Sequence, residues 1–345
     1  MAARSGAKPM NSRLLFIKMV ASGVAFGWLA PELAAAQSWP IRPLSMVVPL
    51  AAGGAGDVLA RVLASRLSEL LGQQVIVENV GGAGGMMGAS RVAKAAPDGY
   101  QFVYGNVGTH AANQTLYERP LYNAATDFAP VALIAEAPIV LIVRRDYPAN
   151  NLQDFTVYAK ANQAKMQYGS AGAGSAAHLA CALLNAEIGV KITHVPYRGG
   201  NPAMQDLIAG RTDYQCALPS DAIPQIESKA VKAIAILSLD RSPILPALAS
   251  AHEQGLPNFT ASTWSAFFFP KGTSPAIVRQ LNEATVATLE TPWVQTKLQE
   301  MGATVVAPAR RSPEYLQQFV GSEIAKWAIV IKAAGISADG AAARP

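Results

Sequence analysis

The chain has 345 residues, and its 28 Lys and Arg against 23 Asp and Glu give a formal net charge of +5 at pH 7. Four of these basic residues and one acidic residue lie in residues 1–36, so the remainder holds 24 basic and 22 acidic residues, a net charge of +2. That remainder has no Lys/Arg-rich run with interleaved aromatic residues, which argues against nucleic acid as a partner.

Residues 1–36 have the order of a secretory signal peptide. A basic stretch is followed by the apolar run Met19–Ala30 and then by Ala34–Ala36, which has the small-residue pattern of a cleavage site. We expect cleavage near Ala36, by the general secretory route, with Met10 as an alternative start to Met1. The apolar run is too short for a membrane anchor, because a spanning helix needs about 20 residues. The mature protein is therefore predicted to be exported.

The mature chain is predicted to form two α/β domains. Its length of about 309 residues exceeds the usual size of a single core. It is rich in Ala, Gly, Val and Leu and poor in charge, a composition typical of layers with buried parallel strands.

The two cysteines, Cys181 and Cys216, allow one disulfide. An exported protein with an even number of cysteines commonly forms such bonds. Two buried free thiols are the alternative, because cysteine is often simply a small core residue. The spacing of the two cysteines does not decide between these alternatives. We favour the disulfide because the protein is predicted to be exported.

A glycine-rich turn, Pro49–Asp57, organises the first part of the mature chain. It follows the apolar strand Leu44–Val48 and precedes an amphipathic helix that ends at Gly72. Glycine lets the backbone approach a ligand closely, and the free N–H groups and dipole of a helix start favour an anion. A turn that merely needs glycine is the alternative for this stretch taken alone.

The alternation of strands and helices continues from there. We expect a strand at Gln74–Glu78, a helix at Gly88–Ala95 and a strand at Phe102–Tyr104. The glycine run before this helix does not match a dinucleotide-binding fingerprint, because Met87 stands where the third glycine would be. Gly105–His110 is predicted to be a polar, flexible segment at the end of its strand.

The middle of the chain repeats the strand-to-helix turn twice. Strands at Val131–Ile134 and Ile139–Val143 predict the crossing into a second lobe, and Asn151 is expected to cap a helix through Ala161. The two further turns are Gly169–Ser175, after a strand at Met166–Tyr168, and Pro196–Pro202, after a strand at Lys191–Val195. In the latter, Asn201 is expected as the N-cap and Pro202 as the first helical residue.

The last part of the chain is predicted to return to the first lobe. Short strands are expected at Tyr214–Leu218, which ends in Pro219-Ser220-Asp221, and at Lys232–Leu237. The aromatic stretch Phe259–Phe269 is the expected return crossing. Helices at Pro275–Glu290, Pro292–Met301 and Ser312–Ala334, a strand at Thr304–Val306 and a loose tail of ten residues complete the chain.

Three helix starts facing one cleft predict a site for a small anion. Open α/β sheets bind ligands at the carboxyl ends of their strands, where these turns lie. Asn106, Thr109, Ser170 and Ser175 are candidates for added hydrogen bonds, and Arg198 for charge. Helix capping is the alternative for the polar side chains, and a surface salt bridge is the alternative for Arg198.

The sequence offers no convincing catalytic set. It has no G-x-S-x-G elbow around Ser175, no H-E-x-x-H, no Walker A lysine and no clustered His and Cys. Its four histidines are scattered, and Asp57 in the first helical turn fits a dipole partner better than a base. We therefore predict no enzyme activity, no metal site and no cofactor.

Several segments together resemble one family, the extracytoplasmic solute receptors of tripartite tricarboxylate transporters, also called the Bug family. The resemblance covers essentially the whole mature chain, and as an ordered set the segments are specific. They are Trp39–Pro43, Gly53-Gly54-x-x-Asp57, Val77–Asn79, Gly81–Gly85, Ala96–Tyr100, Asp127–Val131, Tyr168–Gly172 with His178-Leu179, His194–Gly199, Arg241–Pro243 and Glu253–Pro257.

The resemblance implies a type II periplasmic binding fold: two α/β lobes, two crossing strands and a cleft that closes on a small carboxylate. We expect residues 37–139 and 264–345 in lobe 1 and residues 140–263 in lobe 2, in a monomer that works with the membrane subunits of such a transporter. An orphan sensor or scavenger without a dedicated permease is the alternative. The expected ligand-binding residues are Leu50, Ala52, Gly53, Gly54, Asp57, Asn106, Thr109, His110, Ser170, Ala171, Gly172, Ser175, Arg198, Gly199, Gly200 and Ala217.

Two positions depart from the family pattern. The first turn usually carries Phe and further prolines where this chain has Leu50, Ala51 and Ala52. Many members carry Asp at the place of Ala217, where it is recruited for ligands with an amino group. A free amino acid is therefore disfavoured as the ligand. A plain mono- or dicarboxylate is favoured, and this class includes aromatic acids.

Overall fold

The computed structural model describes residues 1–3, 6 and 39–337. The chain separates into two compact units, residues 1–41 and 42–345. The predicted signal peptide lies almost wholly outside the described residues, as does most of the predicted tail. All the helices and strands described below belong to the second unit.

The first sheet has six strands in the order β11-β4-β10-β3-β1-β2. Strands β1 and β2, and β1 and β3, run parallel, whereas β10 is antiparallel to both β3 and β4. The sheet is thus mixed rather than parallel throughout. The strand bounds are β1 Leu44–Val48, β2 Val75–Asn79, β3 Gln101–Asn106, β4 Phe128–Pro138, β10 Ser262–Pro270 and β11 Thr304–Val305.

The second sheet has five strands in the order β7-β6-β8-β5-β9. Strand β6 is parallel to β7 and β8, and β5 is antiparallel to β8 and β9. The strand bounds are β5 Val140–Arg144, β6 Gln167–Ser170, β7 Thr193–Pro196, β8 Tyr214–Ala217 and β9 Val231–Ile236. We call the elements around the first sheet the first lobe and those around the second sheet the second lobe.

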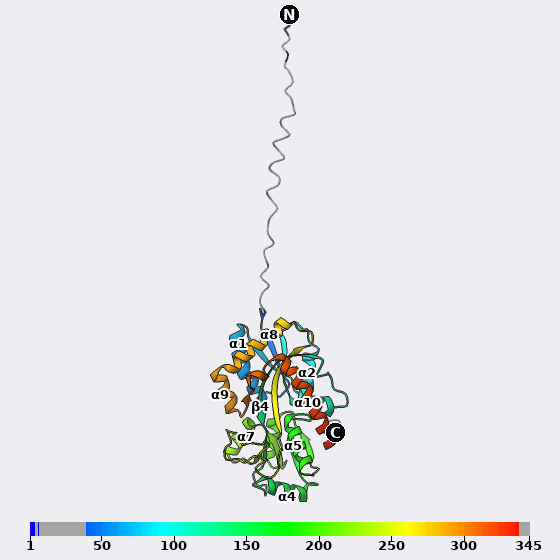
Figure 1. The fold of residues 1–345 in the computed structure, drawn as a ribbon, viewed down its shortest axis with the longest axis vertical. Coiled ribbons are helices and arrows are strands. Elements are labelled where there is room, and N and C mark those ends of the chain that lie inside the picture. The colour runs from blue at the N-terminus through cyan, green and yellow to red at the C-terminus, as the bar shows by residue number, and fades with distance from the viewer. Residues whose placement is uncertain (4–5, 7–38, 338–345) are drawn as a thin grey trace. The chain divides into compact units, whose positions relative to one another are not determined.

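Each sheet is covered by its own helices, as Figure 1 shows for α1, α2, α8, α9 and α10 in one lobe and α4, α5 and α7 in the other. In the first lobe the helices are α1 Ala55–Leu71, α2 Met86–Ala93, α3 Asn113–Leu116, α8 Pro275–Glu290, α9 Pro292–Glu300 and α10 Pro313–Ala334. In the second they are α4 Leu152–Asn162, α5 Ala176–Glu187, α6 Gly200–Ile208 and α7 Pro219–Glu227. The residue boundaries of the two lobes given above remain a prediction.

The chain passes between the lobes twice, and the two crossings are hydrogen-bonded to each other. Strand β4 leads to β5 through Ile139. The Ile139 N–H donates to the Ala261 carbonyl (3.2 Å), and the Leu237 N–H donates to the Ile139 carbonyl (2.8 Å). Ala261 in turn donates to Leu237 (2.8 Å). The two crossings are therefore held together where they pass between the lobes.

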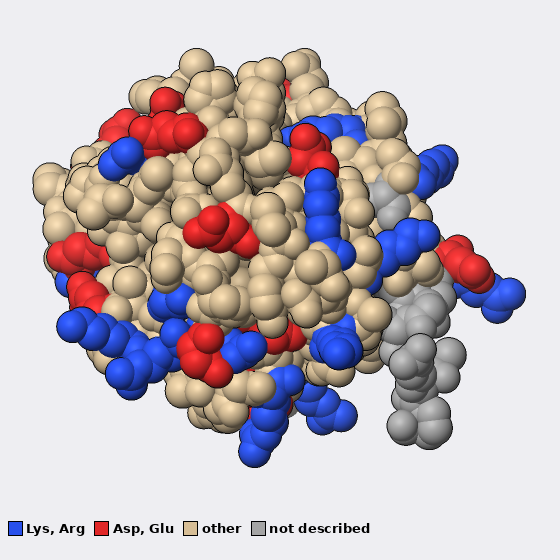
Figure 2. Space-filling model, turned by 90° about the horizontal axis from the view of Figure 1, so that it is seen from below, with Lys and Arg blue, Asp and Glu red and all other residues tan. Residues whose placement is uncertain are grey.

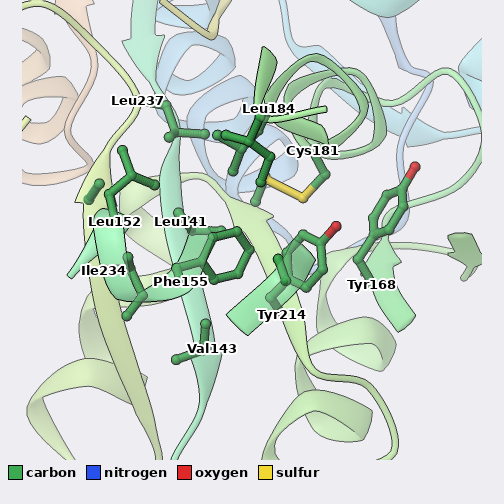
Figure 3. Close-up of a cluster of buried hydrophobic side chains, with 14 of the residues drawn as sticks. Leu141, Val143, Leu152, Phe155, Tyr168, Cys181, Leu184, Tyr214, Ile234 and Leu237 are labelled. Carbon is green, nitrogen blue, oxygen red and sulfur yellow. A yellow bond between two sulfur atoms is a disulfide. The ribbon is translucent and has the colours of Figure 1, made fainter. Parts of the chain in front are cut away.

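The second lobe has a core of aliphatic and aromatic side chains between its sheet and helices α4 and α5. Figure 3 shows Phe155 and Tyr214 in it, beside the disulfide that joins Cys181 to Cys216. Their Cα atoms are 5.5 Å apart, within the span that a disulfide bridges. Cys216 reaches this core because it alternates with Gln215 along β8, so that the two side chains leave opposite faces of the sheet.

Three local predictions were wrong. Gly105–His110 is not a flexible segment: β3 extends to Asn106, and Gly108–Ala112 form a buried π-helical turn. The residues after Ala217 begin a helix, α7, because Pro219 starts it and Asp221 lies in its first turn. Helix α6 begins at Gly200 with Gly199 as its N-cap, so Asn201 is not the cap.

The surface carries charges of both signs. On the face shown in Figure 2, Lys and Arg side chains lie among Asp and Glu side chains. Within residues 39–337, none of the helices combines the length and apolar character required to cross a membrane.

Candidate ligand-binding site

A cavity of about 850 Å³ lies between the two lobes. Its walls are the starts of four helices together with the crossing strands β4 and β10. Cavities of this size accommodate a small organic molecule with some water. Its lining includes Leu50–Ala52, Gly54–Gly56, Gly81–Gly85, Tyr104, Asn106, Tyr117, Ala135–Ala137, Ala171–Ala173, Ser175–Ala177, Pro196–Pro202, Gln215, Ala217, Leu218, Ser220, Asp221, Thr263–Ser265, Met301 and Ala303.

The start of α1 forms the first wall. Gly54, its N-cap, has extended backbone at φ −83° and ψ 168°. Behind it the Asp57 carboxylate accepts hydrogen bonds from the Gly53 N–H (2.9 Å), from Arg61 (3.0 Å) and from Asn79 (2.9 Å). Burial alone would raise the pKa of Asp57, but these bonds together hold it below its usual value. Asp57 therefore stabilises the conformation of the turn through these hydrogen bonds.

The starts of α5 and α6 form two more walls. Ser175 caps α5, its Oγ accepting from the His178 N–H (3.3 Å), while Ala176 and Ala177 face the cavity. Gly199 caps α6 with φ 139°, a conformation that favours glycine. The N–H groups in the first turn of a helix have no partner within the helix, so both starts offer donors to the cavity.

The fourth wall, the start of α7, was missed from the sequence. Leu218, Ser220 and Asp221 line the cavity there. The Asp221 Oδ1 accepts a hydrogen bond from the Ala55 N–H of α1 (3.1 Å), across the space between the lobes. Burial raises the pKa of Asp221 to about 6, although the Ala55 bond opposes this. A proline followed two residues later by Asp, directly after a strand, was the signal that could have identified this helix start.

Two other polar groups face the cavity from the sheets. Glu136 on β4 is held in a two-point ion pair by Arg310 (2.7 and 3.0 Å). Gln215 on β8 is 1% exposed, and its Oε1 has no hydrogen-bond partner among the residues that the structure describes. An unpartnered buried amide is costly, so Gln215 provides a place for a polar ligand atom or water.

The structure brings most of the predicted site residues to the cavity but not all. Those that line it are Leu50, Ala52, Gly54, Asn106, Ala171, Gly172, Ser175, Arg198, Gly199, Gly200 and Ala217. Gly53, which is exposed, and Asp57, which is buried, do not line it, and Thr109, His110 and Ser170 are fully buried elsewhere. Which of these residues touch a ligand stays a prediction.

Two buried histidines, His110 and His178, and the half-buried His194 have structural partners. His110 stacks on Phe268 with ring centroids 3.9 Å apart, and its Nδ1 lies 2.9 Å from the Thr109 hydroxyl. His178 stacks on His194 at 4.0 Å. Burial lowers the pKa of His110 and His194 to about 3 and that of His178 to about 4. All three imidazoles are therefore neutral near pH 7.

Ser170 and His194 form a close hydroxyl–imidazole pair, with Oγ and Nε2 2.7 Å apart. Ser170 is fully buried, and its hydroxyl also donates to the Gly172 carbonyl (3.1 Å). A nucleophile must reach its substrate, and this one does not face the cavity. In the described part of the chain, His, Cys, Asp and Glu form no group of three placed to hold a metal ion.

The lobes also touch each other at a second place. The Tyr117 hydroxyl donates to the Ala173 carbonyl (3.1 Å). At Gly84 (φ +61°), a Cβ atom would lie 2.2 Å from that same carbonyl oxygen. Two backbones thus approach closely here because a residue without a side chain permits it.

A family model described as tripartite tricarboxylate transporter family receptor matches residues 59–336. MatC from Rhodopseudomonas palustris, solved with bound malate, is 39% identical with a TM-score of 0.81, over 85% of this chain and 99% of MatC. The periplasmic binding protein BugD is 38% identical with a TM-score of 0.83, over 87% and 99%. An R. palustris protein solved with adipate is 37% identical with a TM-score of 0.82, again over 87% and 99%.

Proposed function

Because this chain belongs to the tripartite tricarboxylate transporter receptor family, we propose that it captures a small mono- or dicarboxylate in the cavity between its lobes. The observation that carries the proposal is the convergence of four helix starts, α1, α5, α6 and α7, on one cavity. Their N–H groups and dipoles favour a carboxylate. Related proteins solved with malate and with adipate support this ligand class.

The proposed role is that of an exported receptor that delivers its ligand to the membrane subunits of a tripartite transporter. The family and the description of BugD as a periplasmic binding protein support this location and role. The similarity to solute-binding proteins also supports a role without catalysis. An orphan receptor without its own permease remains the alternative, and neighbouring genes for one large and one small membrane subunit would favour the transport role.

The ligand class is tested by a thermal-shift screen. The panel contains malate, adipate, succinate and benzoate. It also contains aspartate, which carries an amino group that these four lack. A ligand at a hundredfold excess over its dissociation constant stabilises the native state by about 2.7 kcal/mol. We expect a plain carboxylate to give the largest shift, with calorimetry confirming a 1:1 complex.

Two results would contradict the proposal. One is a panel in which no carboxylate raises the melting temperature. The other is preference for aspartate over succinate, which would overturn the expectation based on Ala217.

A further inference from the structure

The carboxylate of Asp221 lies at the start of α1, where the free N–H groups of the helix would otherwise bind an anion. Its Oδ1 occupies the Ala55 N–H, a donor that α1 would otherwise offer to a ligand. Asp221 belongs to the second lobe and Ala55 to the first, so this hydrogen bond also joins the lobes. A carboxylate ligand entering the same cavity therefore meets a negative charge already in place.

In the part of the chain that the structure describes, Asp221 forms no ion pair that would neutralise its charge. Against its other oxygen lies Gly200 on α6, where a Cβ would be 3.3 Å from Oδ2. The only cation that lines the cavity among the described residues is Arg198.

Charged groups on the elements around Asp221 are bonded to other residues. Helix α7 packs against β5 and β9, where Arg144 pairs with Asp146 and Asp213, and Lys232 donates to the Tyr147 carbonyl and to Asn150. On α1, Asp57 is bonded to Arg61, and on β4, Glu136 is bonded to Arg310. On α9, Lys297 pairs with Glu300. Glu227, at the far end of α7, is exposed and does not line the cavity.

Two carboxylates in one cavity repel each other, and this repulsion is relieved when one of them takes up a proton. A protonated Asp221 keeps its carbonyl oxygen as the acceptor for the Ala55 N–H. Its new O–H becomes a donor that is able to bond the ligand carboxylate. Protonation thus converts a repulsive neighbour into a binding group without moving the side chain.

We propose that Asp221 takes up a proton from solvent when a carboxylate ligand enters the cavity, so that ligand capture is linked to proton uptake. This inference rests on the proposed function, because it needs an anionic ligand in this cavity. The ligand raises the pKa of Asp221 above its value in the unliganded protein, which is about 6. A group whose pKa rises on binding favours the complex at lower pH.

The sign and range of the effect follow from the two pKa values. Between the unliganded pKa and the higher liganded one, the affinity falls about tenfold for each unit of rising pH. Below pH 6 Asp221 is already protonated without ligand, so the dependence disappears. Above about pH 6 the carboxyl groups of the ligand are themselves ionised, because such groups titrate near 4.

The test is calorimetry of adipate and malate binding at pH 7 in buffers of different ionisation enthalpy, which counts the protons taken up. We expect more than about half a proton per ligand for the wild-type protein. Asp221→Asn keeps an acceptor for the Ala55 N–H but cannot titrate. It should take up none and bind with an affinity that does not change between pH 6.5 and 8. Glu227→Gln, on the same helix, should behave like the wild type.

The outcomes separate this inference from the proposed function. Binding of adipate or malate with no proton uptake overturns the inference and leaves the function standing. Failure of every carboxylate in the thermal-shift panel to bind, at any pH from 5 to 8, overturns both. A ligand-free check is carbon NMR titration of the carboxyl groups, with Asp221 assigned from the Asp221→Asn spectrum; a pKa at or below the ordinary value of about 4 would also overturn the inference.

Discussion

The Asn201 side chain of the second lobe donates a hydrogen bond to the Gly53 carbonyl of the first lobe, at 3.3 Å. Asn201 is exposed at the rim of the cavity, next to the Arg198–Gly200 turn. Because this bond joins the lobes, it exists only while they are together. It should therefore stabilise the closed arrangement and contribute little to the folding of either lobe.

Asn201→Ala should weaken adipate binding about threefold, within the roughly 0.5–1.5 kcal/mol that one neutral hydrogen bond contributes. The free energy of unfolding should change by less than about 0.5 kcal/mol, because the side chain is on the surface. Calorimetry and urea unfolding measure the two quantities. Gln205→Ala, exposed on the same helix, is the control and should alter neither. Equal affinity for Asn201→Ala and Gln205→Ala would show that the bond has no role in capture.

Gly84 offers a separate test of closure. Gly84→Ala introduces a Cβ 2.2 Å from the Ala173 carbonyl oxygen of the other lobe and places alanine at φ +61°. We expect a loss of about 1–2 kcal/mol from backbone strain, and at least a tenfold loss of affinity because the lobes can no longer approach. Small-angle scattering should show a smaller compaction with adipate than in the wild type.

Gly210→Ala is the matched control for that strain. Gly210 has φ +73°, and a Cβ there would meet nothing within 4 Å. It should lose similar stability but retain wild-type affinity. If both variants lose affinity alike, strain rather than blocked closure is the cause, and the contact at Ala173 is not needed for binding.

The elements that the sequence predicted well are those whose ends are set by local chemistry. Helix α8 begins and ends as predicted, because Ser274 caps it and Pro275 starts it. Strand β1 and the end of α1 at Gly72, which has φ +64°, follow equally local rules. Three of the four helix starts around the cavity could be found in this way.

What the sequence did not reveal depends on contacts between distant segments. Strand β10 runs antiparallel to β3 and β4, and no local pattern specifies that direction. The buried turn Gly108–Ala112 carries the polar residues Thr109 and His110, and it is buried because both find partners in other segments, such as Phe268. The sequence placed Pro219-Ser220-Asp221 only at the end of a strand, because proline, serine and aspartate are common in turns as well as at helix starts.

Three histidines with lowered pKa values predict that the folded protein is sensitive to acid. His110, His178 and His194 have folded-state pKa values of about 3 to 4, below the unfolded value near 6.5. The unfolded chain therefore binds more protons below pH 6.5, and stability is lost as the pH falls from there toward 4. Each histidine adds up to about 1.4 kcal/mol per pH unit to this slope.

Urea unfolding at a series of pH values measures that slope. His110→Phe replaces one imidazole by a ring that can still stack on Phe268, so its slope should be smaller by about 1.4 kcal/mol per unit. His252→Gln, at an exposed position, should leave the slope unchanged. An unaltered slope in His110→Phe would show that His110 is not neutral in the folded protein.

The disulfide between Cys181 and Cys216 should contribute substantially to stability, because it closes a loop across 35 residues. Replacing both by alanine should cost about 3–4 kcal/mol in urea unfolding, from the added freedom of the unfolded chain. Protein from the periplasm should resist alkylation until it is both unfolded and reduced. Labelling of either cysteine in unfolded but unreduced protein would contradict the bond.

Gly54 tests the location of the site itself. Backbone donors cannot be deleted by mutation, so the variant must block the approach of the ligand instead. Gly54 has extended backbone, and a Cβ there would meet only the Ala51 carbonyl oxygen at 3.8 Å. Gly54→Val should therefore fold, at a cost of about 1 kcal/mol because valine is a poor N-cap. Its branched side chain would extend into the cavity that Gly54 lines.

We expect Gly54→Val to bind adipate at least tenfold more weakly, a loss of about 1.4 kcal/mol. Gly54→Ala shares the loss of the glycine cap but adds only one methyl group, so it separates the capping effect from the steric one. Its affinity should lie between those of the wild type and Gly54→Val. Since only a ligand that binds the closed form better shifts the lobes together, compaction with adipate should weaken in the same order. Unchanged affinity in a well-folded Gly54→Val protein would place the ligand away from the start of α1.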